Sequence, residues 1–198
     1  MISMRQKLLC FCLFLSTILA LFCSFSCAVR KKVPLEDLKS SYTAQVLIRI
    51  GEVEAEGTVC AEGEDSGRER SILLELEKPS SLTGLSLLLS PGGVTLSEPQ
   101  LAPISLPIIQ SSSFGALYRM LSAEGSVNSI SSARGADVGL PEYDRITRVS
   151  TDSAIIYIDP EDSTPIKAEC SSSGYSIQIF FYSFQPIEDG QPLQLTLA

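Results

Sequence analysis

A period of two in the apolar side chains runs through most of this chain and restricts it to a sheet structure. In the stretch YTAQVLIRI, which begins at Tyr42, every second residue is apolar. This alternation is typical of a strand with one buried face. Similar stretches, separated by turns such as Pro91-Gly92-Gly93, occupy residues 53–62, 70–77, 85–89, 94–96, 154–170, 175–184 and 193–197. We therefore expect at least seven strands in a largely antiparallel sheet.

Only one segment has convincing helical periodicity. Residues 111–123 carry an apolar stripe, with Ser112 or Ser113 as a suitable N-cap and Gly125 as the stop. The stripe consists of Phe114, Leu117, Met120 and Leu121. The residues before it, 97–110, hold three prolines and no period, which favours a loop. Residues 126–145 are rich in Ser and Gly and favour no particular element.

A single helix of this length cannot cover the apolar side of so many strands. At 1.5 Å per residue, ~13 residues extend for about 20 Å. Either the sheet curls on itself, or a second sheet or a ligand covers the rest. We therefore expect a mainly β (α+β) fold, with a curved, largely antiparallel sheet, a hydrophobic hollow and at least one covering helix. The side chains predicted to line its hollow are those of Val46, Ile48, Leu74, Leu76, Leu87, Ile177, Ile179 and Phe181.

The helix has two possible roles. It is either an ordinary core helix or a lid over the hollow, since the segments on both sides of it look more mobile than the strands. A methionine such as Met120 adapts to irregular apolar ligands, which suits a lid.

Three stretches resemble the LolA/LolB-like family of lipoprotein carriers. They are SYTAQVLIRI from Ser41, LEKPSSLTGLSLLLSPGGVTL from Leu76, and AIIYIDPEDSTPIKAECSSSGYSIQIFFYSF from Ala154. That family has a curved antiparallel sheet that forms a half-barrel closed by helices, and its apolar hollow holds the acyl chains of lipoproteins or other lipids, so the resemblance implies a half-barrel here. The resemblance implies a single domain over residues 41–198 and an acyl chain or a lipoprotein as ligand. A membrane-anchored member would look more like LolB than LolA.

The N-terminus predicts export. Arg5 and Lys7 precede 20 residues, Leu8 to Cys27, that contain no charge. This is the pattern of a secretory signal, although the run is also long enough to span a membrane. Ser24-Phe25-Ser26-Cys27 resembles a bacterial lipoprotein box, in which the cysteine is diacylated. Cleavage after Ala28 and a retained anchor are the alternatives, and all three export the rest of the chain.

These features predict a signal over residues 1–27, lipid attachment at Cys27, and a tether over residues 28–40. The expected location is the extracytoplasmic face of a cell membrane, with membrane lipid as the partner of the N-terminal anchor. After Cys27 the chain has 13 basic and 23 acidic residues, a net charge of −10, so we expect no nucleic-acid partner.

The composition also argues against catalysis. The chain has no histidine, which excludes Ser-His-Asp and Cys-His arrangements. Asp159, Glu161 and Asp162 form the best carboxylate cluster, and we interpret it as a solvated hairpin turn. We expect no enzyme activity, no cofactor and no metal. The predicted function is binding of an apolar ligand in the hollow; the alternative is a non-catalytic envelope module with a filled core.

Two cysteines, Cys60 and Cys170, remain outside the N-terminal region. In an exported chain they could pair or stay as buried thiols, and the sequence leaves both possibilities open.

Overall fold

The computed structural model describes residues 35–63, 69–107, 112–172 and 174–187. The chain divides into two compact units, Met1–Val33 and Pro34–Ala198, and every described residue lies in the second. The helices are α2 (Glu36–Lys39), α3 (Ser113–Ser122) and the 3-10 helix η1 (Gly135–Val138). The strands are β1 (Tyr42–Ile50), β2 (Val53–Ala61), β3 (Ile72–Lys78), β4 (Ser86–Ser90), β5 (Gly93–Glu98), β6 (Leu101–Pro107), β7 (Val127–Ala133), β8 (Ile146–Thr151), β9 (Ile155–Ile158), β10 (Pro165–Ser172) and β11 (Tyr175–Pro186).

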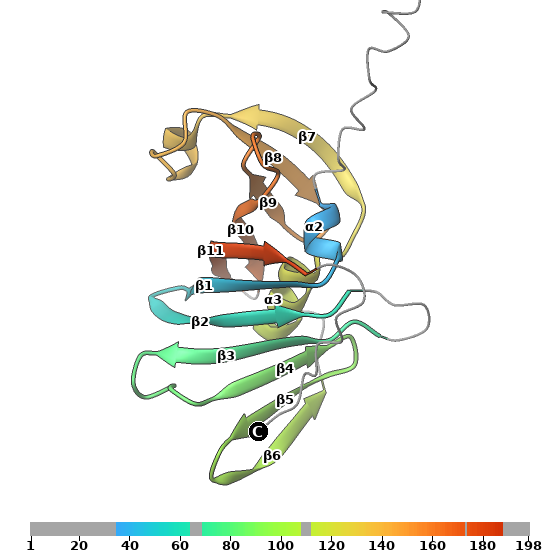
Figure 1. Cartoon of the computed structure of the whole chain (residues 1–198), viewed down its shortest axis with the longest axis vertical. Coiled ribbons are helices and arrows are strands. Elements are labelled where there is room, and N and C mark those ends of the chain that lie inside the picture. The colour runs from blue at the N-terminus through green and yellow to red at the C-terminus, as the bar shows by residue number, and fades with distance from the viewer. Residues whose placement is uncertain (1–34, 64–68, 108–111, 173, 188–198) are drawn as a thin grey trace, which may run out of the picture. The chain divides into compact units, whose positions relative to one another are not determined.

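All eleven strands form one sheet in the order β6-β5-β4-β3-β2-β1-β11-β10-β9-β8-β7. Every neighbouring pair is antiparallel. The sheet is curved and is not closed into a barrel (Figure 1). The mainly β, largely antiparallel fold predicted from the sequence is therefore confirmed, with more strands than the minimum expected.

The topology explains why α3 lies on one face of the sheet. The chain first runs outward from β1 to the edge strand β6, and then continues through α3 to the opposite edge strand β7. From β7 it returns inward to β11, which pairs with β1. A connection between opposite edges has to cross a face of the sheet, and α3 is the helical part of that crossing.

The same helix shows how strongly the sheet curves. Helix α3 packs against β3 and β4 on one side and against β10 and β11 on the other. Strands β4 and β10 are five positions apart in the sheet. In a flat sheet they would be separated by about 24 Å, whereas a helix is only about 10 Å across. The sheet therefore bends around α3, and we call the face that holds α3 the concave face and the other the convex face.

The main core lies between the concave face and the two helices. Its rows of side chains follow the strand register, for example Val59, Leu74, Leu87 and Leu96 on β2 to β5. A smaller cluster of Leu140, Ile146, Tyr157 and Ile166 lies on the convex face of β8 to β10. The polar and apolar alternation of the strands thus separates two layers, as their period predicts.

Two segments outside the expected strands are in fact edge strands. The predicted loop over residues 97–110 was wrong, because β6 pairs with β5 in spite of Pro103 and Pro107. Proline is tolerated at an edge, where the outer side of the strand needs no ladder hydrogen bond. The unassigned segment 126–145 contains β7 and η1, and β7 is held by pairing with β8 rather than by its own weak alternation.

The predicted tether over residues 28–40 extends too far into the domain. Leu35 and Leu38 are each 1% exposed and belong to the main core, and α2 begins directly after Leu35. Helix α3 agrees with the prediction except for its stop, since it ends at Ser122 and the left-handed C-cap residue is Ala123 rather than Gly125. The signal segment, Cys27 and the expected strand at residues 193–197 lie outside the described residues.

Candidate functional site

Helix α3 covers the middle of the concave face with the apolar stripe predicted for it. Ser112 caps the helix by accepting a hydrogen bond from the Gly115 backbone N–H at 3.2 Å. Of the four stripe residues, Leu117, Met120 and Leu121 are buried, and Phe114 is partly buried against the same core. Whether this helix is a lid stays a prediction.

The eight side chains predicted to line a hollow lie together on the concave face. All are buried, at 7% exposure or less, and all belong to the main core with α3. Three cross-strand pairs within the set are Val46 with Phe181, Ile48 with Ile179, and Leu74 with Leu87. Their common face follows from the period of two. Their role around a ligand stays a prediction.

Two hydrogen bonds join α3 to the sheet beneath it. The Tyr42 hydroxyl on β1 donates to the Leu121 carbonyl oxygen at 2.7 Å, at the C-terminal end of the helix. The Tyr118 hydroxyl donates to the Arg70 carbonyl oxygen at 3.4 Å. Burial raises the pKa of Tyr42 far above its usual value, although the nearby Arg70 guanidinium opposes this. The phenol is therefore neutral and remains a donor well beyond neutral pH.

Arg70 joins the end of helix α2 to the residues that precede β3, a contact that the sequence did not suggest. The residue is 4% exposed, and its guanidinium donates to the carbonyl oxygens of Leu38 (2.5 Å), Lys39 (2.8 Å) and Ser40 (3.2 Å). These are carbonyls at the end of α2, which the helix itself cannot satisfy. In the sequence, the buried role of Arg70 is indicated only by its position just before an apolar strand.

The apolar concave face is wider than its helical cover. Large apolar side chains that are exposed in the described part of the chain are Val53 (63%), Leu101 (62%), Tyr175 (59%), Ile104 (58%), Ile130 (55%), Tyr182 (52%), Leu106 (44%) and Val127 (42%). By strand register Tyr182 points to the convex face, Leu101 lies beyond a register shift between β5 and β6, and the other six point to the concave face. Ile104, for example, pairs with Leu96 of the core, and Ile130 pairs with the buried Val149. We call this set without Leu101 and Tyr182 the apolar rim.

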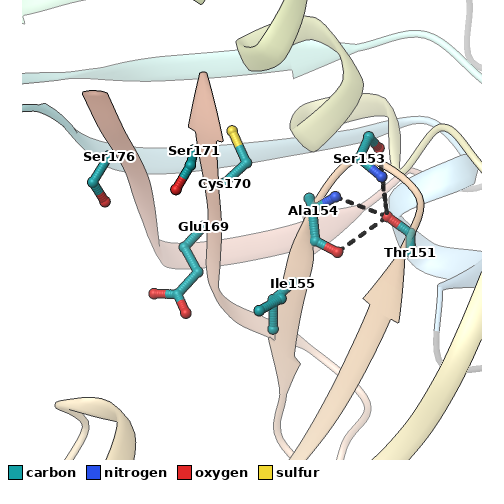
Figure 2. A pocket seen from close by; sticks show the side chains of 8 residues that line it. All are labelled: Thr151, Ser153, Ala154, Ile155, Glu169, Cys170, Ser171 and Ser176. Carbon is teal, nitrogen blue, oxygen red and sulfur yellow. Dashed lines mark hydrogen bonds between the residues drawn. The ribbon is translucent and has the colours of Figure 1, made fainter. Parts of the chain in front are cut away.

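Two cavities lined by described residues lie elsewhere. One of about 370 Å³ opens between the β8–β9 turn and the end of β10, where Thr151 accepts backbone hydrogen bonds and where Glu169 and Cys170 are among the lining residues (Figure 2). The other, of about 490 Å³, lies beside Tyr143, Ile166 and the last residues of β11. Of the eight residues predicted to line the hollow, only Phe181 borders either of these two cavities.

A polar network on the convex face is satisfied by its own members. Lys167, 6% exposed, forms an ion pair with Glu169 at 2.8 Å and donates to the Val138 carbonyl oxygen at 3.3 Å. The Tyr157 hydroxyl donates to the other Glu169 oxygen at 2.6 Å. Burial, helped by this hydrogen bond, raises the pKa of Tyr157 to about 12. The network attaches the η1 segment to β9 and β10, which is a structural role.

Burial alone would raise the pKa of Glu169. The hydrogen bonds from Lys167 and Tyr157, with the positive charge of Lys167, outweigh burial and hold the pKa below its usual value. The carboxylate is thus ionised near neutral pH and is fully engaged within the network.

The cysteines cannot pair in this fold. Cys60 and Cys170 are both free thiols. Cys60 alternates with the core residues Val59 and Ala61 and so faces the convex side, whereas Cys170 pairs with the buried Ile177 on the concave side. Strands β2 and β10 are also three positions apart, about 14 Å, while a disulfide needs Cα atoms within about 7 Å.

The acidic turn agrees with the interpretation from the sequence. Asp159 accepts from the Glu161 backbone N–H at 2.8 Å, and Asp162 accepts from the backbone N–H and the hydroxyl of Thr164. The side-chain hydrogen bond from Thr164 lowers the pKa of Asp162. Among the described residues, no group of three or more His, Cys, Asp or Glu side chains is placed to hold a metal ion.

In the portion of the chain with a described structure, no helix has both the length and the apolar character required to cross a membrane.

Comparison with known proteins gives similarity in fold alone. No protein-family model matches the sequence, and no curated protein matches it. Among solved structures, the chain is similar to an uncharacterized conserved protein from Thermus thermophilus, with a TM-score of 0.48 and 18% identity over 77% of this chain and 82% of that chain. It is also similar to a LolA superfamily protein from Nitrosomonas europaea (TM-score 0.39, 12% identity, 78% of this chain and 92% of that chain).

The lipoprotein LppX from Mycobacterium tuberculosis is a third similar structure (TM-score 0.36, 13% identity, 78% of this chain and 93% of that chain). A LolA superfamily protein is thus among the structures of similar fold, in agreement with the resemblance drawn from the sequence. Similarities this low describe the arrangement of strands and carry nothing about ligand or partner.

Proposed function

We propose that this protein binds an acyl chain or another apolar ligand on the concave face, against the apolar rim around α3. The observation that supports this most is the position of the exposed apolar side chains. Scattered apolar residues on a surface are ordinary, but here six of the eight lie by register on one face, the face that carries the core. They lie at the two edges of the sheet and at hairpin ends, where an apolar ligand can reach them.

Binding of this kind needs no chemical step. Each Å² of apolar ligand surface that leaves water contributes about 25 cal/mol, so the rim can retain a chain without a catalytic group. We accordingly propose a protein that is not an enzyme. The covered middle of the concave face is filled by aliphatic side chains, so the ligand lies along the rim unless α3 moves.

The setting we propose is the cell envelope, in lipid or lipoprotein handling. The signal over residues 1–27 and a lipid at Cys27 would place the β domain on the extracytoplasmic face of a membrane. Intact-mass analysis of the processed chain tests this part: an acylated N-terminal Cys27 supports it, and a mature chain that begins at Val29 contradicts it. Replacement of Cys27→Ala should prevent processing at that site.

A second candidate function is an envelope interaction module without a ligand. It is favoured by the complete burial of the eight predicted hollow residues and by the hydrogen bond from Tyr42 to α3. In that case the apolar rim would contact a protein instead of a lipid.

A photo-crosslinking amino acid in place of Ile104 distinguishes the two functions in cells that express the full chain. Irradiation should give a lipid adduct on this position, detectable by mass spectrometry of the purified protein. The control places the same amino acid at Tyr182, which is similarly exposed but points to the convex face. Protein adducts at position 104 would favour the interaction module. Equal lipid labelling at both positions, or none at position 104, would contradict lipid binding at the rim.

A further inference from the structure

The two edges of the sheet differ in what they offer to another strand. An edge strand exposes backbone N–H and C=O groups and can pair with a further chain unless something prevents it. Strand β6 forms one edge and β7 the other, and within the described part of the chain no strand lies beyond either. Every residue of β6 is exposed, and in β7 only the last residue is partly covered.

The β6 edge is blocked by proline. Strands β4 and β5 are joined by the two-residue turn Pro91-Gly92, so the pair Ser90 and Gly93 is hydrogen-bonded, and the backbone of Val94 points to β6. Its partner Leu106 therefore points inward, and Ser105 points outward. The neighbouring outward positions are Pro103 and Pro107, which have no N–H. An added strand would find a single donor between two prolines.

The β7 edge carries no proline, and its register against β8 shifts only at the start of the strand, between Val127 and Ser129. The Thr151 backbone N–H donates to the Ala154 carbonyl oxygen at 2.8 Å, which directs Thr151 toward β9 and Ser150 toward β7. Ser129 pairs with Ser150, and Ser131 pairs with Arg148, so both point inward. The backbone groups of Ile130 and Ser132 consequently point away from the sheet. The strand VNSISSA has no proline and no charge among its seven residues.

We infer that β7 pairs with β7 of a second copy of this chain, antiparallel and centred on Ile130. The two sheets then continue into each other across a two-fold axis. In this register Ile130 lies opposite its own counterpart, and their backbone groups form a hydrogen-bonded pair. The Ile130 side chains of both copies lie on the concave side, since each continues the row of Val149.

The sequence of β7 matches itself in this register. Ser129 faces Ser131 of the second copy on each side of the central Ile130 pair, so polar residues meet polar ones and apolar meet apolar, and the register shift of β7 at Val127 lies outside these central pairs. Cross-strand pairs of this kind stabilise a sheet, and like charges directly opposite would oppose it. The chain has a net charge of −8, so an uncharged edge is where two copies approach with the least repulsion.

Cysteine crosslinking of the full chain in the membranes of expressing cells tests the inference. Ile130→Cys places two thiols across the two-fold axis, at the Cα separation of about 5.5 Å that a disulfide accepts. Under mild oxidation the chain should shift to a band of twice its mass on a non-reducing gel. The control, Ile104→Cys, lies on the blocked edge at nearly the same exposure (58% against 55%) and should remain monomeric. Both variants keep the native cysteines, so background oxidation is the same.

A second variant excludes chance collision. Ser132→Pro removes an outward N–H from β7, as Pro103 and Pro107 do in β6, and leaves the bonds to β8 intact. Added to Ile130→Cys, it should abolish the dimer band. Equal crosslinking at positions 130 and 104, no dimer at position 130, or a disulfide from position 130 to a different protein would each overturn the inference.

Discussion

The middle and the rim of the concave face have the same chemistry and opposite exposure. Met120 in α3 and Leu74 beneath it are at most 1% exposed, whereas Ile104 and Ile130 at the two edges are more than half exposed. All four side chains are apolar, and all lie on the concave side of the sheet, Met120 in the helix and the other three in strands. They differ in whether α3 covers them, since the chain crosses the concave face once and α3 reaches only the middle of it. The middle therefore supplies stability, and the rim remains exposed to solvent.

The same comparison explains the polar contacts around α3. Tyr42 and Arg70 direct buried donors to carbonyls at the ends of α3 and α2, close to the sealed middle. Such groups are costly to leave without partners in a dry environment. At the exposed rim, polar backbone groups can form hydrogen bonds with water instead. Four predictions test this difference from the largest effect to the smallest, each measured by denaturant unfolding with circular dichroism because the chain has no tryptophan.

Truncation in the middle should have the largest effect. Met120→Ala removes a fully buried side chain and should lower the free energy of unfolding by about 2–5 kcal/mol. Ile104→Ala at the rim should change it by no more than about 0.5 kcal/mol. Equal losses at both sites would mean that the rim is also part of the core.

Removal of the Arg70 guanidinium should lower the free energy of unfolding by less than Met120→Ala does. Arg70→Met keeps the aliphatic part but deprives the carbonyls of Leu38, Lys39 and Ser40 of their donor, at a cost of about 1–3 kcal/mol. The matched control is Arg49→Met, since Arg49 pairs with Glu54 at 2.7 Å on the surface and exposed pairs contribute about 0–1 kcal/mol. A loss at Arg49 as large as at Arg70 would contradict this assignment.

Loss of the Tyr42 hydroxyl should have a moderate effect. Tyr42→Phe leaves the Leu121 carbonyl without this donor and should destabilise the fold by about 1 kcal/mol. Tyr182→Phe, on the exposed convex side, should be neutral. If α3 is a lid, Tyr42→Phe should also speed the uptake of a fluorescent fatty acid by the full chain. Unchanged uptake kinetics would argue for a core helix.

The last expected effect, which is absent at neutral pH, is a loss of stability under alkaline conditions. The pKa values of Tyr42 and Tyr157 are raised in the folded state, that of Tyr157 to about 12. A raised pKa contributes stability that is complete below the unfolded value of about 10 and is lost as pH rises through the folded value. The free energy of unfolding should thus fall above about pH 10, and Tyr42→Phe should reduce this slope. An unchanged slope in that variant would show that Tyr42 does not titrate with unfolding.

Much of the fold could be predicted because the strands alternate strictly. Burial of the sequence from Tyr42 to Ile48, and of Ile177 to Phe181, repeats the period of two residue by residue. Helix α3 was predictable for the same reason, through its stripe and its Ser112 cap. Strands β6 and β7 were not, since Leu-Ala-Pro-Ile and Val-Asn-Ser-Ile lack a regular alternation and are held by their neighbours β5 and β8.

The candidate site divides in the same way. The period of two in the sequence identified the eight buried residues in the covered middle. The apolar rim could not be identified in this way, because it depends on how much of the concave face the connection from β6 to β7, with α3, covers.

By itself the sequence determined which residues face the same side of a strand, where the one long helix forms, and that chemistry based on histidine is excluded. These follow from side-chain period and composition, which act locally. Only the tertiary structure decided that the two sheet edges are joined across one face, that Arg70 caps α2, and that Cys60 and Cys170 lie on opposite sides. Those features rest on contacts between residues distant in sequence, whose free energy appears only after the sheet has assembled around α3.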